Sequence, residues 1–382
     1  MKIRISQFSL LFVLAAYAAL AGPAAAAEVS NEQLLSGIAI FSKPIDVSTL
    51  ADPGILETDD TMRAFVAEHV RGAKSGREKL RRLLAGMIET GLLSLDYNQV
   101  ETKTAKQTFY DRVGNCISFT NLFVALGREA GLEVVYQTVD IPPLWYSESD
   151  LIILNNHINV VVSSKFDDRI IVDFNIPEFK GNYDSSEISD RHAFALYHNN
   201  IAMDALTEGD AETSFRYLKK AILLDPDVPD PWVNLGVVYS RHNLPDYALA
   251  AYKMGLALDH DNRSALTNIA SLYRSLGKTR AANRYSRRIR AYQKRNPYFH
   301  YYRARFAFNN NNFDEALHSL NRAIRLKETE HQFHSLKGRI NYKLGHQEES
   351  LKNFVRAREL AGFESMQKKY DQKIALLAAA QP

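Results

Sequence analysis

The stretch Trp232-Val-Asn-Leu-Gly-Val-Val-Tyr239 decides how the second half of this chain folds. Its two aromatic residues flank a Leu-Gly pair, a spacing typical of a helix that packs closely against a neighbouring helix. The glycine position is occupied by a small residue every 34 residues, and a second small-residue register repeats with the same period. A fixed period of this length predicts stacked helix pairs from about residue 195 to 364. The first register is Ala202, Gly236, Ala270, Ala304 and Gly338, and the second is Ser214, Ala248, Ala282, Ala316 and Ser350.

These two registers and the W-x2-L-G-x2-Y pattern resemble the tetratricopeptide repeat family, with five units over nearly half the chain. The resemblance implies an all-α solenoid whose concave surface binds a peptide or a protein. Units three to five depart from the family pattern, since Ser286 replaces a large residue and Arg303 and Lys337 replace apolar ones. We expect these units to be looser or to carry a binding face. An unrelated helical bundle is the alternative, but a bundle needs no fixed long period.

A basic stretch lies in the third and fourth units. Ten Lys or Arg residues and no Asp or Glu occur between Lys278 and Arg305, interleaved with tyrosines. One interpretation is a groove that holds an acidic peptide or a C-terminal carboxylate by charge-assisted hydrogen bonds. The other is a solvated face, or one that faces acidic lipids. The residues predicted to contact a partner are Arg284, Arg287, Arg288, Tyr292 and Arg303.

The chain's one cysteine, Cys116, begins a second motif. It follows Val113-Gly114-Asn115, and apolar residues at helical spacing run from Phe119 to Ala130, where Gly131 ends the pattern. Cys116 is therefore predicted to lie in the first turn of a helix. The unpaired N–H groups and the dipole at that end favour the thiolate form.

Three apolar segments after this helix have the composition of strands, at residues 132–139, 157–162 and 170–173. His157 opens the second segment and Asp173 closes the third. If these two strands are antiparallel neighbours, the imidazole and the carboxylate lie side by side and can form a hydrogen bond. The helix start would then bring the thiol to the imidazole.

Gly114-Asn115-Cys116 at a helix start, His157 at a strand start and Asp173 in Val-Asp-Phe-Asn resemble the transglutaminase-like superfamily over about residues 60–190. The resemblance implies a papain-like α+β core in which Cys116 is the nucleophile and His157 the general base and acid. It also implies that Asp173 orients His157. The backbone N–H of Cys116 is one candidate for the oxyanion donor.

Each of these residues also has a structural interpretation. A lone cysteine is often a small buried apolar residue. In this view, His157 is a core histidine and Asp173 is a strand-end cap. A zinc site is disfavoured because one cysteine without a His-x-x-x-His pair falls short of the usual ligand spacing. We predict no cofactor, and we expect His192 and His198 to be surface residues.

The first residues predict a signal peptide over residues 1–27. Lys2 and Arg4 precede an apolar run too short to span a bilayer, and small residues end at Ala27. An uncleaved anchor or a core helix is the alternative, whereas a lipoprotein is excluded because no cysteine lies near the cleavage site. The expected domains are a transglutaminase-like domain at 28–192, with a helical lead-in to about residue 100, five repeats at 195–364 and a C-terminal helical tail at 365–382.

The net charge of +3 over 382 residues does not favour nucleic acid or an anionic membrane as the main partner. We therefore expect a periplasmic or secreted thiol enzyme that attacks amide or peptide bonds through an acyl-enzyme, with the repeats recruiting a protein or peptide. Membrane association is not required. Hydrolysis ranks first because water is the abundant acceptor, and transamidation would use the same triad. The alternative from another class is a catalytically silent scaffold for an envelope protein complex.

Overall fold

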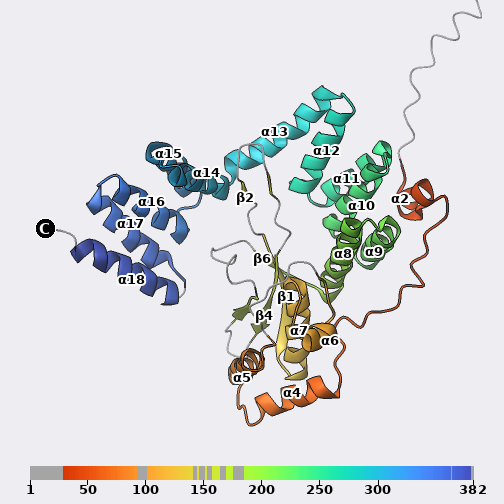
Figure 1. The fold of residues 1–382 in the computed structure, drawn as a ribbon, viewed down its shortest axis with the longest axis horizontal. Coiled ribbons are helices and arrows are strands. Elements are labelled where there is room, and N and C mark those ends of the chain that lie inside the picture. The colour runs from red at the N-terminus through yellow and green to blue at the C-terminus, as the bar shows by residue number, and fades with distance from the viewer. Residues whose placement is uncertain are drawn as a thin grey trace, which may run out of the picture.

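The structure, a computed structural model, describes residues 29–92, 101–140, 144–145, 151–152, 157–163, 169–174, 185–362 and 364–379. The predicted signal peptide lies outside these residues. Within them, the chain forms a small antiparallel sheet with helices, followed by a helical solenoid (Figure 1). The predicted class, an α+β core followed by an all-α solenoid, is confirmed. None of the described helices has both the length and the apolar composition needed to cross a bilayer.

The four-stranded sheet has the spatial order β5-β4-β1-β6, and all its pairings are antiparallel. Its three apolar strands lie within two residues of the segments predicted from the sequence. The fourth strand was not predicted, because its residues Ser-Ser-Glu-Ile lack an apolar pattern. The strands are β1 (Glu133–Val139), β4 (His157–Ser163), β5 (Arg169–Val172) and β6 (Ser185–Ile188), with a separate pair of β2 (Leu144–Trp145) and β3 (Leu151–Ile152).

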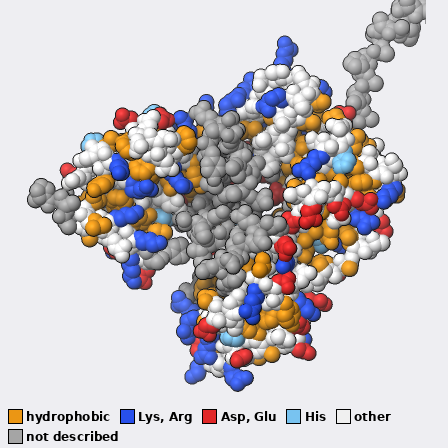
Figure 2. All heavy atoms as spheres, in the orientation of Figure 1, with side chains coloured by type: hydrophobic (Ala, Val, Ile, Leu, Met, Phe, Trp, Pro, Cys, Tyr) orange, Lys and Arg blue, Asp and Glu red, His pale blue; other side chains and the backbone are white. Residues whose placement is uncertain are grey.

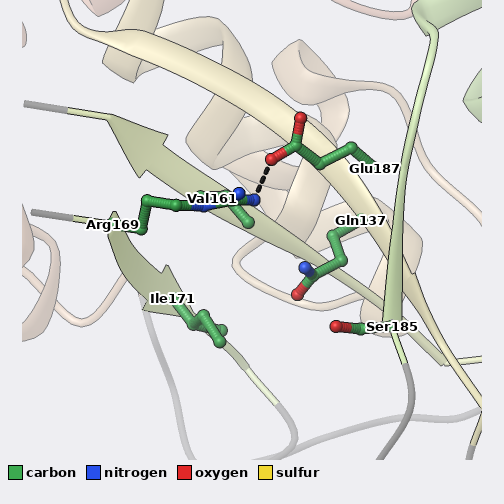
Figure 3. A pocket seen from close by; sticks show the side chains of 6 residues that line it. All are labelled: Gln137, Val161, Arg169, Ile171, Ser185 and Glu187. Atoms are coloured by element: carbon green, nitrogen blue, oxygen red, sulfur yellow. Dashed lines mark hydrogen bonds and ion pairs between the residues drawn. The ribbon is translucent and has the colours of Figure 1, made fainter. Parts of the chain in front are cut away.

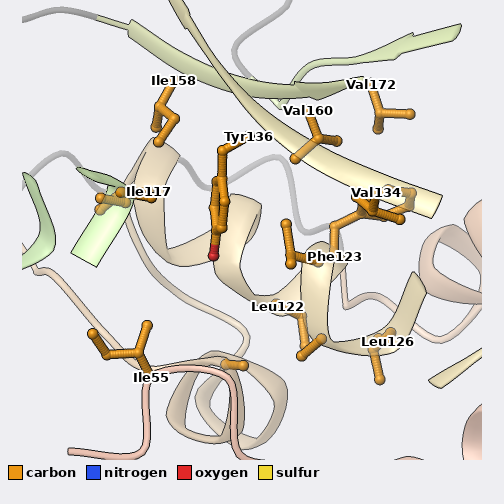
Figure 4. Packing of buried hydrophobic residues seen from close by; sticks show 14 of the residues in the cluster. Ile55, Ile117, Leu122, Phe123, Leu126, Val134, Tyr136, Ile158, Val160 and Val172 are labelled. Carbon is orange, nitrogen blue, oxygen red and sulfur yellow. The ribbon is translucent and has the colours of Figure 1, made fainter. Parts of the chain in front are cut away.

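One face of this sheet is covered by helix α7 (Cys116–Glu129), which is almost entirely buried. Strand β1 alternates, so that Val134 and Tyr136 pack against α7 with Phe123 (Figure 4). The Tyr136 hydroxyl donates a hydrogen bond to Asn121 of α7 at 2.7 Å. This core holds the first turn of α7 in place against the sheet. Three further helices complete it, α4 (Asp60–Val70), α5 (Gly76–Glu89) and α6 (Ala105–Asp111).

The first two described helices, α2 (Asn31–Ser36) and α3 (Ile38–Phe41), pack on the repeats and not on the sheet. Leu34 and Ile45 are buried there, and the Tyr239 hydroxyl donates to the Leu34 carbonyl at 2.6 Å. The Lys219 ammonium donates to the Ile45 carbonyl at 2.6 Å. The helical lead-in expected up to about residue 100 is therefore divided between two cores.

The solenoid consists of five antiparallel helix pairs and a closing helix. All ten residues of the two small-residue registers are buried, so the predicted packing is confirmed. The closing helix covers residues 364–379, and the last three residues of the tail predicted at 365–382 lie outside the described residues. The pairs are α8 (Asp190–Glu208) with α9 (Ala211–Leu224), α10 (Pro229–Arg241) with α11 (Pro245–Leu258), α12 (Arg263–Ser275) with α13 (Thr279–Arg295), α14 (Pro297–Asn309) with α15 (Phe313–Leu326), and α16 (His331–Lys343) with α17 (Gln347–Leu360), before α18 (Glu364–Ala379).

The small residues match the size of the side chain that faces them. A Cβ atom built on Gly236 would lie 2.5 Å from the ring of Tyr252, and one on Gly338 would lie 3.0 Å from the ring of Phe354. The third unit has alanine in this register and Ser286 in the facing one. The departure at Ser286 therefore replaces a glycine–aromatic contact with a smaller pair.

The apolar core of the solenoid is interrupted between α13 and α14. One buried cluster ends at Tyr285 of α13, and the next begins at Tyr298 of α14. Only Ala282 and Tyr285 of α13 are buried, because most of this helix is polar. The apolar core of the array is therefore divided into separately packed clusters, and α13 connects the first of them to the next (Figure 1).

Helix α8 belongs to both cores. Its first half packs on the sheet module through Ala193, Leu196 and Tyr197, and its second half packs on the repeats through Ala202 and Leu206. The two modules also meet farther along the array. There the Arg263 guanidinium of α12 donates to Asp140 at 2.9 Å, and β2 lies against α14.

Candidate active site

Cys116 is the first residue of α7, as predicted, and its thiol is free and partly buried. Asn115 caps the helix, since its side-chain oxygen accepts a hydrogen bond from the Ser118 backbone N–H at 3.1 Å. The N–H groups of the first turn have no carbonyl four residues back within the helix. The thiol thus lies where the backbone favours a negative charge.

His157 and Asp173 come from neighbouring antiparallel strands and face each other. The His157 Nε2 atom lies 2.8 Å from Oδ1 and 2.7 Å from Oδ2 of Asp173. Both side chains are nearly inaccessible, at 4% and 8% exposed. The contact arises because β4 and β5 are antiparallel neighbours with Val160 opposite Val172, so Asp173 comes next to Asn159 and close to His157.

The imidazole of His157 also hydrogen-bonds with the thiol of Cys116. Burial works against the charged ring, but the hydrogen bonds to Asp173 and to Cys116 outweigh it and raise the pKa of His157 from 6.5 to about 9. A charged imidazole beside a thiol is the arrangement that cysteine nucleophiles use.

This raised pKa predicts that the free energy of unfolding falls as the pH rises above neutrality. The folded state retains a proton on His157 up to about pH 9, whereas the unfolded chain loses it near 6.5. The protonated His157 therefore adds on the order of 1–3 kcal/mol to the free energy of unfolding below pH 6.5, and this stabilisation is lost as the pH rises through about 9. Urea denaturation at about pH 6 and pH 9.5 should show this loss in the wild type and not in His157→Ala. Equal losses in both proteins would contradict the assignment.

A fourth polar residue, Asn159, belongs to this site and was not predicted from the sequence. Its side chain is fully buried and its amide donates to Oδ2 of Asp173 at 2.9 Å. Asn159 thereby fixes the position of the Asp173 carboxylate, which in turn orients the His157 imidazole. The sequence does contain a clue to Asn159. It lies two residues after His157 on a predicted strand, and alternate residues of a strand point to the same face.

The same sheet face continues into a pocket of about 490 Å³ (Figure 3). Gln137, which lies opposite Asn159 in the β1–β4 register, is one wall. An ion pair between Arg169 and Glu187 crosses the pocket. The remaining lining residues are Val161, Ile171 and Ser185. In the described part of the chain, no three His, Cys, Asp or Glu side chains are grouped as metal ligands.

The cap of α7 is linked to the first repeat. The Asn115 amide donates to the Thr102 hydroxyl at 2.8 Å, and that hydroxyl donates to Asp204 of α8 at 3.3 Å. Burial raises the pKa of Asp204, and the hydrogen bond from Thr102 partly offsets this. A repeat helix thus supports the residue that positions Cys116.

The residues predicted to bind a partner differ in how far they are engaged within the chain. Arg284 and Arg287 are exposed on α13, whereas Arg288 donates to the His260 carbonyl. The Tyr292 hydroxyl accepts from Arg263 at 2.5 Å. Arg303 pairs with Glu315 at 2.9 Å. Three of the five side chains are thus engaged within the chain.

The expectation of a surface position is wrong for His198. Its side chain is 4% exposed and stacks on Tyr217. Burial lowers the pKa of His198 to about 4, and Lys220 adds to this effect, so the ring is neutral at physiological pH. His192 is 28% exposed and lies 3.6 Å from Asp225. The error arose because α8 is shared by two cores, which the sequence pattern of one helix does not reveal.

Comparison with known proteins finds two families in this chain. A model of the transglutaminase-like superfamily matches residues 63–147, and a tetratricopeptide repeat model matches residues 267–331. The chain therefore carries a transglutaminase-like segment followed by tetratricopeptide repeats, as the two resemblances predict. The first match includes Cys116 and ends before His157 and Asp173. The repeats indicate protein–protein interaction.

Similar solved structures include MamA, from residue 41 to its end, of Desulfovibrio magneticus RS-1. It is 17% identical and the alignment covers 45% of this chain and 96% of that chain, with a TM-score of 0.25. PilF of Pseudomonas aeruginosa is 15% identical over 50% of this chain and 96% of its own, with a TM-score of 0.27. YrrB, described as a TPR protein with an unusual peptide-binding site, is 15% identical over 47% and 92%, with a TM-score of 0.25. No curated protein matches the chain.

Proposed function

We propose that this chain is an exported thiol enzyme that cleaves amide or peptide bonds through Cys116, His157 and Asp173, and that its repeats recruit a protein or peptide partner. The observation that carries the proposal is the buried His157–Asp173 pair, with Cys116 as the other hydrogen-bond partner of the imidazole. The match to the transglutaminase-like superfamily supports the same chemistry. The pattern of residues 1–27 supports export.

In this mechanism, the Cys116 thiolate attacks the carbonyl carbon of an amide and forms a tetrahedral oxyanion. The backbone N–H of Cys116 is the donor best placed to stabilise that oxyanion. The protonated His157 gives its proton to the leaving amine as the C–N bond breaks, which leaves a thioester on Cys116. Asp173 keeps the imidazole in one orientation and stabilises its charge throughout.

The thioester is then released by an acceptor that His157 deprotonates. Water gives hydrolysis, and a primary amine gives transamidation through the same residues. We propose hydrolysis, because water is the abundant acceptor outside the cell.

The test is the pH dependence of alkylation of Cys116 in the wild-type protein. A thiol paired with imidazolium reacts with iodoacetamide as thiolate well below pH 8, whereas an ordinary thiol has half of its full rate near pH 8.5. Intact-protein mass spectrometry follows the reaction directly, since Cys116 is the only cysteine. We expect a rate that is nearly constant from about pH 6 to 8. A rate that rises tenfold per pH unit over this range would instead favour the catalytically silent scaffold.

A further inference from the structure

We propose that the outer face of α13 binds an acidic, extended segment of a partner protein. The inference deepens the proposed function, on whose recruiting role for the repeats it rests. Helix α13 buries Ala282 and Tyr285 on one side and partly buries Ile289. On the other side, every charged residue is a cation, and all of them are exposed: Arg280, Arg284, Arg287, Arg290, Lys294 and Arg295.

The helices next to this cationic face in the array, α12 and α14, carry no acidic residues. The sequence from Arg263 to Phe313 contains twelve Lys or Arg residues and no Asp or Glu, so α12, α13 and α14 supply no carboxylate. Within the described ranges, none of the six exposed cations of α13 forms an ion pair. Lysines elsewhere on the array do, as Lys352 does with Glu348 and Lys368 with Glu364. Like charges one turn apart on a helix repel one another, so a ligand that brings carboxylates to this face relieves a cost of the unbound state.

The spacing of the cations defines the shape of the ligand. Arg280, Arg284, Arg287 and Lys294 are separated by four, three and seven residues, which aligns them along one side of the helix. The 17 residues of α13 extend over roughly 25 Å. An extended peptide of about eight residues covers that length. Its alternate side chains recur about every 6.6 Å, close to the pitch of the helix of about 5.4 Å. Acidic residues at alternate positions therefore meet successive cations.

The position of α13 distinguishes this surface from the concave side of the array. α13 is the second helix of its unit, and Figure 2 shows Lys and Arg gathered over α12 and α13 at the outer edge of the molecule. On the opposite side, Tyr292 of α13 is engaged by Arg263, which reaches Asp140 of the sheet module. The apolar side of α13 packs within the array, so this helix has no apolar face left to insert into lipid, as a membrane-bound amphipathic helix requires.

The experiment measures binding of a fluorescein-labelled (Glu-Ser)4 peptide to the mature full-length chain by fluorescence anisotropy. The chain carries Cys116→Ala, so that thiol chemistry plays no part. We expect binding that weakens as NaCl rises from about 50 to 300 mM. The triple variant Arg280→Gln/Arg284→Gln/Arg287→Gln should bind at least about tenfold more weakly, since three ion pairs are lost. Replacing the same three residues with lysine should preserve binding.

The matched control neutralises three exposed cations of the sheet module, Arg71, Lys74 and Arg81. This control should keep wild-type affinity. Equal losses in both glutamine variants would show that net charge alone is responsible and would overturn the proposal. So would the absence of peptide binding, including the case in which vesicles with about 30% phosphatidylserine bind instead. Because the background lacks the nucleophile, failure here leaves the alkylation test of the proposed function unaffected.

Discussion

Replacing His157 with alanine is expected to slow the alkylation of Cys116 by iodoacetamide on the order of 10- to 100-fold at about pH 6.5. In the proposed triad, the imidazolium of His157 pairs with the thiolate. Without it, only about one per cent of an ordinary thiol is ionised at that pH. The lower nucleophilicity of a stabilised thiolate reduces the ratio below the full hundredfold. Stopped reactions analysed by intact-protein mass spectrometry give the rates.

Two further variants make this result specific. Asp173→Asn is expected to slow alkylation in the same direction, because the hydrogen bond that raises the pKa of His157 is weakened. His318→Ala removes an exposed histidine of α15 and should react like the wild type. All four proteins should converge at about pH 9.5, where an ordinary thiol is ionised as well. If His157→Ala and the wild type react equally at pH 6.5, the thiol is not paired and the enzyme proposal fails.

A chain that ends at residue 192 is expected not to fold. This is the boundary that the sequence pattern predicts for the transglutaminase-like domain, but the core of the sheet module continues beyond it. Leu196 and Tyr197 of α8 are buried in that core and contribute roughly 1.5–3 kcal/mol each. The total stability of a domain is only about 5–15 kcal/mol. Losing α8 also removes Asp204 from the hydrogen bonds that support the cap of α7.

The measurement is urea denaturation followed by far-UV circular dichroism. The 28–192 chain should show no cooperative transition, whereas a matched chain of residues 28–295 should unfold cooperatively. The longer chain keeps α8 and ends at α13, where the apolar core of the array is interrupted. A cooperative transition with the same midpoint in both chains would show that the boundary lies where the sequence pattern places it.

Much of the candidate site follows from local patterns. An apolar helical run that follows Gly114-Asn115 placed Cys116 in a first turn, and two β-branched segments placed His157 and Asp173 at strand ends. The contribution of Asn159 was recognisable only once the face of β4 toward the carboxylate was known. The contact of Thr102 with Asp204 joins residues about a hundred positions apart, and no local pattern encodes such a contact.

The sequence by itself determined the periodic solenoid, the helix that starts at Cys116 and the strands that carry His157 and Asp173. Each of these follows from the spacing of residues along one element, because that spacing fixes which side chains lie on the same face of a helix or strand. Only the tertiary structure decided that α8 is shared by two cores and which arginines of the basic stretch remain available. Those properties depend on which residues, from segments far away in the sequence, contact a side chain in the folded protein. In the sequence, Arg288 and Arg303 cannot be distinguished from Arg284. In the fold, Arg288 donates to a backbone carbonyl and Arg303 pairs with Glu315, because folding brings other segments of the chain next to them.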